Sequence, residues 1–186
     1  CGTCWPASTA RCRIRSGVLR PLRMNRSRRG TFDAWSPWRR GADVTGLDIT
    51  PPMLDDAREN AEVAGVDVDW REGDATDLPF PDDAFDVALS CVGHMFAAPA
   101  DATAEELLRV TRPGGRIAFT SWTPRSVVPA MARVLQEDLP PNPDAPAPPF
   151  LWGDSEVVQE RLSEGISDLT FETGVVEQLS LSPSHV

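Results

Sequence analysis

The sequence predicts an α/β fold in which a mostly parallel sheet carries helices on both faces. Two observations lead to this prediction. From Gly41 onward, short apolar runs alternate with helical patterns in units of roughly thirty residues, the length of a strand with its crossover helix. The run FDVALSCV, residues 85–92, is apolar at nearly every position, which is typical of a strand buried on both faces of a parallel sheet.

The first predicted unit starts with a strand over residues 42–48. Thr50 then has the character of an N-cap, Pro51 suits the first helical position, and Gly65 ends the helix. The elements expected next are a strand over 66–70, the strand over 85–92, a helix over 102–111, a tight turn over 112–115 and a strand over 116–122.

The remainder of the chain has a less regular pattern. We expect a helix over 126–138 and then an extended connector over 139–150, since this stretch contains six Pro. Asp154 has the character of an N-cap for a short helix over 154–165. Residues 168–181 are expected to form a hairpin or a pair of edge strands.

Charge is distributed unevenly along the chain. All 18 basic residues are Arg and the net charge is −10. Residues 1–40 hold 10 Arg and one acid, a charge of +9, while residues 41–186 hold 8 Arg and 27 acids, a charge of −19. The acidic body disfavours binding to nucleic acid or to an anionic membrane. Acidity without Lys is typical of a halophilic protein, and a GC-rich genome is the alternative explanation.

Residues 1–40 show neither helical nor strand periodicity. An Arg-rich, Trp-bearing nucleic-acid tail, a disordered tail and a stretch translated in the wrong frame are the three interpretations. The abrupt change at Gly41 favours the wrong frame. Cys1 and Cys4 have metal-ligand spacing but no second pair, so no metal site is predicted. Without a run of about 20 apolar residues or a signal-peptide pattern, the expected location is the cytoplasm.

Acidic side chains follow two successive predicted strands. Asp48 ends the strand over 42–48, and Asp74 follows the next strand in the stretch EGDATDLPF. In a parallel sheet, ligands bind at the carboxyl ends of the strands. Asp48 is suited to accept hydrogen bonds from a ribose diol and Asp74 from an adenine amine, with the N–H of Ala75 beside it. A solvated turn is the alternative for either acid alone.

Three stretches resemble class I S-adenosylmethionine-dependent methyltransferases, in particular the type 11 group that includes ubiquinone and menaquinone biosynthesis C-methyltransferases. They are GADVTGLDITPPMLDDARENA, REGDATDLPFPDDAFDVALSCVGHMF and LLRVTRPGGRIAFTSW, and the resemblance covers about residues 41–165. It implies a Rossmann-like fold, S-adenosylmethionine as cofactor, and these roles: Asp48 on the ribose, Ile49 packed on the adenine, Asp74 and Ala75 at the adenine edge, and Ser90 near the methionine moiety.

The chain departs from that family at both ends, so the fold is expected to be incomplete there. The family opens with a strand and a Gly-rich loop, of which only CGT, with Gly2, corresponds here. We therefore divide the chain into an atypical segment over 1–40, a cofactor-binding core over 41–124 and a substrate-side region over 125–186.

Methyl transfer from a sulfonium needs positioning more than a nucleophilic side chain. His94 is the candidate base, with a locally bonded histidine as the alternative. Met95, Phe96, Phe150, Leu151 and Trp152 suggest a small organic acceptor. Two other functions stay open. They are a methyltransferase remnant that does not bind the cofactor, and a nicotinamide-dependent dehydrogenase, which would require its own Gly-rich fingerprint.

Overall fold

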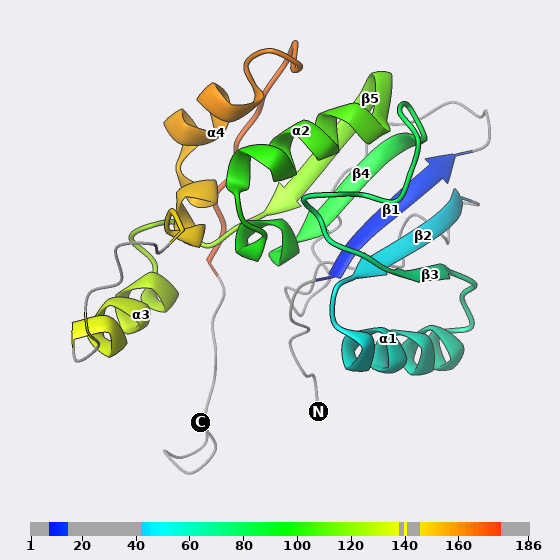
Figure 1. Ribbon diagram of the computed structural model, residues 1–186, viewed down its shortest axis with the longest axis horizontal. Coiled ribbons are helices and arrows are strands. Elements are labelled where there is room, and N and C mark those ends of the chain that lie inside the picture. Colours follow the sequence, from blue (N-terminus) through cyan, green and yellow to red (C-terminus); the bar gives the residue numbers. More distant parts are fainter. Residues whose placement is uncertain (1–7, 15–41, 138–139, 141–145, 176–186) are drawn as a thin grey trace.

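The computed structural model describes residues 8–14, 42–137, 140 and 146–175, and within them five strands form one sheet (Figure 1). The strands are β1 (Ser8–Ile14), β2 (Ala42–Asp48), β3 (Asp69–Glu72), β4 (Phe85–Cys91) and β5 (Thr111–Thr120). Their order across the sheet is β3-β2-β1-β4-β5.

Four of these strands run in the same direction. β2 pairs in parallel with β3, and β4 pairs in parallel with β5. β1 lies between β2 and β4 and is antiparallel to both, so β2 and β4 are themselves parallel. This arrangement confirms the mostly parallel sheet that the sequence predicts.

Strand β1 lies within residues 1–40, where the sequence shows no strand periodicity. Strands β2 and β4 would otherwise each present an unpaired row of backbone N–H and C=O groups to the gap between them. Backbone pairing does not require apolar alternation in the side chains, so a segment without strand periodicity pairs with both edges. Gly2 and residues 15–40 lie outside the described residues, as do the proposed N-terminal motif and its connection to β2.

Helices connect and flank the strands. They are α1 (Pro51–Ala64), α2 (Ala100–Val110), α3 (Val127–Glu137) and α4 (Ser155–Leu162), with the 3₁₀ helices η2 (Gly93–Phe96) and η3 (Pro149–Gly153). α1 packs beside β2 and β3, and α2 packs on β4 and β5 (Figure 1). The crossovers from β2 to β3 and from β4 to β5 proceed in opposite directions across the sheet. Right-handed crossovers therefore place α1 and α2 on opposite faces, as predicted.

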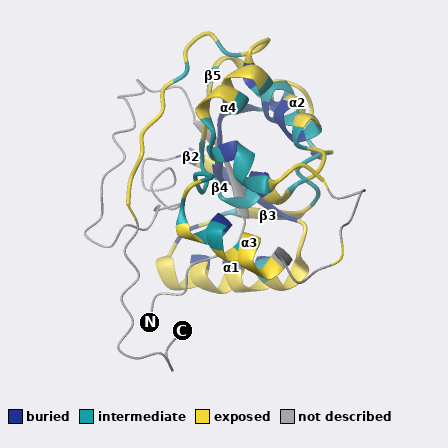
Figure 2. Cartoon of the chain, turned by 90° about the vertical axis from the view of Figure 1, so that its left-hand side faces the viewer, coloured by how far each residue is buried: buried dark blue, intermediate teal, exposed yellow. Residues whose placement is uncertain are grey.

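The core lies between the sheet and these helices (Figure 2). Strand β4 is buried on both faces. Phe85, Val87 and Leu89 are buried on one face, and Ala88 and Ser90 are buried on the other. The outer surface of α1 is exposed, and this helix buries only Leu54, Ala57 and Ala61. Burial of β4 places its carboxyl end in the interior, next to the elements that follow it.

Several predicted elements differ from the structure, and three of these differences change the description of the fold. The strand expected at 66–70 is β3, which starts three residues later. Val66 is still part of the end of α1, because its N–H donates a hydrogen bond to the Ala61 carbonyl. The turn expected at 112–115 is a bulge inside β5, with Gly114 at a φ of 75°. Residues 168–175 contain no strand, so the expected hairpin is wrong over that part, and the rest of it lies outside the described residues.

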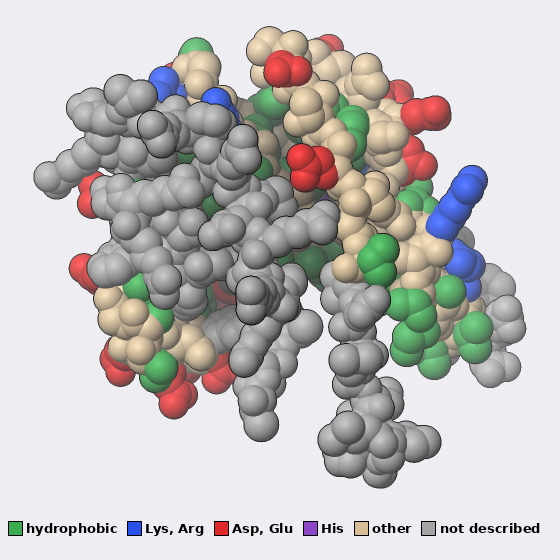
Figure 3. Space-filling view, turned by 180° about the vertical axis from the view of Figure 1, so that it is seen from behind, with side chains coloured by type: hydrophobic (Ala, Val, Ile, Leu, Met, Phe, Trp, Pro, Cys, Tyr) green, Lys and Arg blue, Asp and Glu red, His purple; other side chains and the backbone are tan. Residues whose placement is uncertain are grey.

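Helix α3 exposes an apolar stripe. Val127, Met131, Val134 and Leu135 are more than half exposed, while Pro129 on the other side is buried. Figure 3 shows these hydrophobic side chains gathered at the lower right of the rear view, where α3 lies. In the part of the chain that the structure describes, none of the helices combines the length and the apolar character needed to cross a membrane.

Candidate functional site

Asp48 is a buried carboxylate at the carboxyl end of β2, with only 5% of its surface exposed. Its Oδ1 accepts a 2.8 Å hydrogen bond from the backbone N–H of Thr50, the residue that precedes α1. Its Oδ2 is buried and has no partner among the described residues. Burial raises the pKa of the Asp48 carboxyl, against the lowering effect of the Thr50 hydrogen bond. The charged form of Asp48 is therefore short of hydrogen-bond donors.

Asp74 lies in a turn after β3 that its own groups stabilise. Its Oδ1 accepts a 2.9 Å hydrogen bond from the Thr76 N–H, and its carbonyl accepts one of 3.3 Å from the Asp77 N–H. Such bonds are typical of aspartate at the start of a turn. Ala75 packs against the cluster around Leu47 and Phe85, which fixes the turn on the core.

The ends of β2 and β3 are joined directly. Asp48 is in register with Glu72, and the Gly73 N–H donates a 3.1 Å hydrogen bond to the Asp48 carbonyl. A strand spacing of about 4.8 Å and a rise of about 3.3 Å per residue place the Cα atoms of Asp48 and Asp74 roughly 8 Å apart. The two acids therefore lie at one edge of the sheet, close enough for a single nucleoside to reach both. Their proximity follows from this strand register, and their contacts with a ligand stay a prediction.

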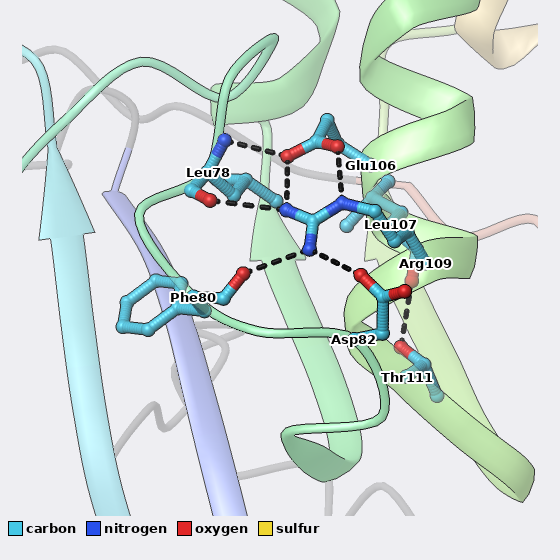
Figure 4. A network of polar contacts seen from close by, with 7 residues as sticks. All are labelled: Leu78, Phe80, Asp82, Glu106, Leu107, Arg109 and Thr111. Carbon is cyan, nitrogen blue, oxygen red and sulfur yellow. Dashed lines mark hydrogen bonds and ion pairs between the residues drawn. The ribbon is translucent and has the colours of Figure 1, made fainter.

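The loop that follows Asp74 is fixed by Arg109 of α2 (Figure 4). The guanidinium donates to the carbonyls of Leu78, at 3.0 Å, and Phe80, at 2.8 Å. It also pairs with Glu106 at 2.6 Å and with Asp82 at 2.8 Å. The hydrogen bonds that Arg109 donates to Glu106, and then the one that it donates to Asp82, raise the pKa of Arg109, which is charged at any physiological pH.

Glu106 completes this arrangement. Its Oε2 accepts a 2.6 Å hydrogen bond from the Leu78 N–H and a bond of 2.7 Å from Arg109 (Figure 4). Arg109 and Glu106 thus bind the loop through both backbone and side-chain groups, and we call them the loop clamp. The loop clamp could not be predicted from the sequence, because its partners are mainly backbone atoms that leave no residue pattern.

Ser90 and His94 form a second polar pair at the end of β4. The Ser90 Oγ accepts a 3.1 Å hydrogen bond from the His94 N–H and lies 3.0 Å from His94 Nδ1. Val92 between them has a φ of 66°, a conformation rare for a β-branched residue, and it turns the chain back toward β4. This turn is what brings His94 onto Ser90.

His94 is fully buried between aromatic rings. Its ring centre lies 4.5 Å from that of Phe119 and 4.7 Å from that of Trp152. Burial lowers the pKa of His94 to about 3, so the imidazole is neutral at neutral pH. A group with so low a pKa is a weak general base, which favours the locally bonded histidine over the predicted base.

Three other features of the described residues bear on a ligand site. Ile49, next to Asp48, is 61% exposed and offers an uncovered apolar surface beside the buried carboxylate. A surface hollow of about 330 Å³ is lined by residues of α4 and of segment 166–171. Within the described part of the chain, no group of three or more His, Cys, Asp or Glu could hold a metal ion.

The chemistry at the end of β2 fits an adenosine. A buried carboxylate oxygen that lacks a donor matches a ribose hydroxyl, and an exposed Ile49 beside it matches the face of a purine. The fit rests on Asp48, Ile49, Asp74 and Ala75, which the structure places at one edge. Ser90 lies at the end of β4, on the other side of β1.

Comparison with known proteins points to the same chemistry. Residues 29–119 match the family described as a methyltransferase domain. The matched span begins before Gly41, so it includes part of the segment that the sequence analysis set apart.

Two relatives and one solved structure are particularly similar. The chain is 36% identical over 134 residues to an uncharacterized protein of Mycobacterium tuberculosis, covering 72% of this chain and 49% of that protein. It is 44% identical over 84 residues to a demethylmenaquinone methyltransferase of Thermus thermophilus, covering 45% of this chain and 38% of that protein. A solved structure described as "Conversion of a Disulfide Bond into a Thioacetal Group during Echinomycin Biosynthesis" is 29% identical, with a TM-score of 0.54, covering 72% of this chain and 57% of that one.

The chain spans about half the length of the mycobacterial relative.

Proposed function

Because the chain belongs to the class I S-adenosylmethionine-dependent methyltransferases, we propose that it binds S-adenosylmethionine at the edge formed by β2 and β3 and methylates a small organic acceptor. The observation that carries this proposal is the buried Oδ2 of Asp48, which has no partner among the described residues. A ribose diol supplies the hydroxyl donors that such a carboxylate needs.

Each residue at this edge has a distinct binding role. Asp48 accepts hydrogen bonds from the ribose, and the exposed side chain of Ile49 packs on the adenine. Asp74 accepts from the exocyclic amine, with Ala75 next to it. The loop clamp keeps the turn that carries Asp74 in place through the carbonyls of Leu78 and Phe80.

The bound cofactor supplies an electrophilic methyl group on its sulfonium. The chain's own contribution is to orient the cofactor and to exclude water. Ser90, at the buried end of β4, lies on the side of the sheet where the methionine moiety is expected. In this role the Ser90–His94 pair positions groups, and no proton transfer by His94 is required.

A small organic acceptor suits the residues that follow β4 and β5. Met95 and Trp152 are buried there, and Phe96 is exposed at the end of η2. An apolar surface next to a few polar groups is typical of a small-molecule site. The name of the Thermus thermophilus relative, a demethylmenaquinone methyltransferase, is in keeping with an acceptor of this size.

Isothermal titration separates the proposal from its two alternatives. We expect S-adenosylhomocysteine to bind the chain and NADH not to bind. Binding of NADH alone would support a dehydrogenase, and binding of neither would support a remnant of a methyltransferase domain that has lost the cofactor.

A matched pair of variants tests the assignment of Asp48. Asp48→Ala removes hydrogen bonds to a charged acceptor, and such bonds contribute ~1–3 kcal/mol, or roughly 5- to 150-fold in affinity. Asp67→Ala removes an exposed carboxylate from the loop before β3 and should leave the affinity unchanged. Equal affinities of the two variants would contradict the proposed ribose contact.

A further inference from the structure

Three side chains from separate elements meet around Trp152, and we call the four residues the Trp152 cluster. It consists of Trp152 in η3, His94 in η2, Phe119 near the end of β5 and Arg161 in α4. The ring centre of Trp152 lies 4.7 Å from that of His94 and 5.5 Å from that of Phe119. The Arg161 Cζ lies 5.0 Å from the Trp152 ring centre.

The cluster lies on the β4 and β5 side of the sheet. η2 follows β4 directly, and Phe119 is the last residue but one of β5. The Trp152 cluster is therefore beyond the carboxyl ends of these two strands, whereas Asp48 and Asp74 are beyond the ends of β2 and β3. The two sites are separated by β1 and share the same edge of the sheet.

Three buried polar atoms of this cluster have no hydrogen-bond partner among the described residues. They are His94 Nε2, Trp152 Nε1 and Arg161 Nη1. His94 and Trp152 are 0% and 2% exposed, and the Arg161 side chain is 12% exposed. An unsatisfied buried polar group is costly, so native proteins keep few of them. Three around one ring indicate a partner that the described residues do not supply.

All three atoms are donors. Trp Nε1 and Arg Nη1 carry protons in every state. The buried Ser90 hydroxyl already accepts from the His94 N–H, and His94 Nδ1 at 3.0 Å is an acceptor within reach of its proton. We assign Nδ1 as the acceptor of the Ser90 proton, because no other acceptor for that proton is found among the described residues, and the neutral ring then carries its proton on Nε2. The missing partner is therefore a group of acceptors.

The charge of Arg161 further limits which acceptor group can bind to the cluster. Arg161 contributes one positive charge, and its Nε pairs at 3.2 Å with Asp101, whose side chain is 80% exposed. This pairing is weak in solvent, so the guanidinium retains capacity for a second anion. A carboxylate, with one charge and four lone-pair positions, matches one cation and three donors. A doubly charged phosphate would leave one negative charge uncompensated in a chain of net charge −10.

We propose that the Trp152 cluster binds a carboxylate group of the methyl acceptor. This inference rests on the proposed function for the identity of the acceptor, and it assigns Arg161, Trp152 and His94 as the groups that recognise the acid. Ser90 acts on the carboxylate only through His94, by fixing which nitrogen carries the proton.

The test uses two aliphatic probes of equal size, hexanoate and hexanamide, on the whole chain. We expect hexanoate to shift the indole N–H signal of Trp152 in ¹⁵N NMR spectra and to bind at least ten-fold more tightly than hexanamide. The signal is assigned with Trp152→Phe, which keeps the aromatic ring. Equal binding of both probes, or an unmoved Trp152 signal, would overturn the proposal and leave ordered water as the partner of the three donors.

Variants separate this inference from the proposed function. Arg161→Gln should weaken hexanoate binding at least ten-fold and leave the binding of S-adenosylhomocysteine unchanged, while Arg58→Gln, an exposed arginine of α1, should alter neither. Asp48→Asn should have the opposite pattern, with hexanoate binding retained and S-adenosylhomocysteine binding weakened. Hexanoate affinity that is unaffected by Arg161→Gln counts against the inference, whatever the chain does with the cofactor.

Discussion

The Gly73 N–H donates a 3.1 Å hydrogen bond to the carbonyl of Asp48, and this bond ties the two acidic strand ends together. The contact is close because Gly73 has no side chain. A Cβ at this position would meet Leu47 Cδ1 at 2.8 Å and Pro79 Cδ at 3.2 Å. The same glycine therefore sets the distance between β2 and the turn that carries Asp74.

Gly73→Ala should separate these strand ends. Leu47 is buried in the core, so its displacement carries the cost of overpacking, about 1–3 kcal/mol of unfolding free energy. We expect weaker binding of S-adenosylhomocysteine together with a lower denaturation midpoint in urea. Gly174→Ala is the matched control, because a Cβ there meets nothing within 4 Å. Similar loss in both variants would show that the effect is not specific to the close approach at Gly73.

Asp48→Asn should have opposite effects on stability and on binding. Burial raises the pKa of Asp48, so above that pKa the folded state holds a charge that the unfolded chain solvates better. Replacing the charged carboxylate by a neutral amide removes this cost. We expect a higher melting temperature without ligand and a lower affinity for S-adenosylhomocysteine. The comparison is made by thermal denaturation and titration of the same preparation, and a lower melting temperature would show that the buried charge is compensated.

Arg109→Gln should loosen the loop over residues 78–82. The variant loses hydrogen bonds to two backbone carbonyls and the pairing with Glu106 and Asp82. Hydrogen bonds to charged groups contribute about 1.5–3 kcal/mol each at most, and the side chain is partly exposed, so we expect a net loss of about 2 kcal/mol in unfolding free energy. Faster amide hydrogen exchange at Leu78 would locate the change in this loop.

Arg112→Gln provides the comparison for the loop clamp. Arg112 pairs with Asp86 at 2.5 Å from an exposed position and is three residues from Arg109. Exposed ion pairs contribute about 0–1 kcal/mol. A loss from Arg112→Gln equal to that from Arg109→Gln would mean that general charge, and not the contacts with the loop backbone, stabilises this region.

The sequence predicted the features that depend on local pattern. The strand over 42–48 and the helix after it follow from apolar spacing. The helix ends at Gly65, as predicted, and Gly65 has a left-handed φ of 66°, which favours glycine. The nearness of Asp48 and Asp74 follows from the parallel order of their strands. The N-cap at Asp154 is also confirmed, since its Oδ1 accepts from the N–H of Glu156 and of Val157.

Features that depend on distant contacts could not be predicted. Arg109 contacts backbone atoms about thirty positions earlier in the chain, and no residue type marks a carbonyl acceptor. Trp152 and Arg161 meet His94 only after η3 and α4 fold onto the end of β4. β1 pairs with β2 and β4 in the structure, although the residue pattern of its sequence gave no sign of a strand.

His94 should make the stability of the protein depend on pH below neutrality. Burial lowers its pKa to about 3 in the folded state, compared with 6.5 for an ordinary histidine. Between these values the unfolded chain binds a proton that the folded chain does not, so stability is fully present above about pH 6.5 and falls as the pH is lowered toward 3. Arg161 contacts the Trp152 ring that packs against His94, and Arg161 keeps its charge throughout this range. The slope from this single group is about 1.4 kcal/mol per pH unit.

In His94→Gln the slope between pH 6 and pH 4.5 should decrease by that amount in urea denaturation, while His185→Gln serves as the control. An unchanged slope in His94→Gln would mean that the imidazole is accessible to protons in the folded state, and it would restore His94 as a candidate base.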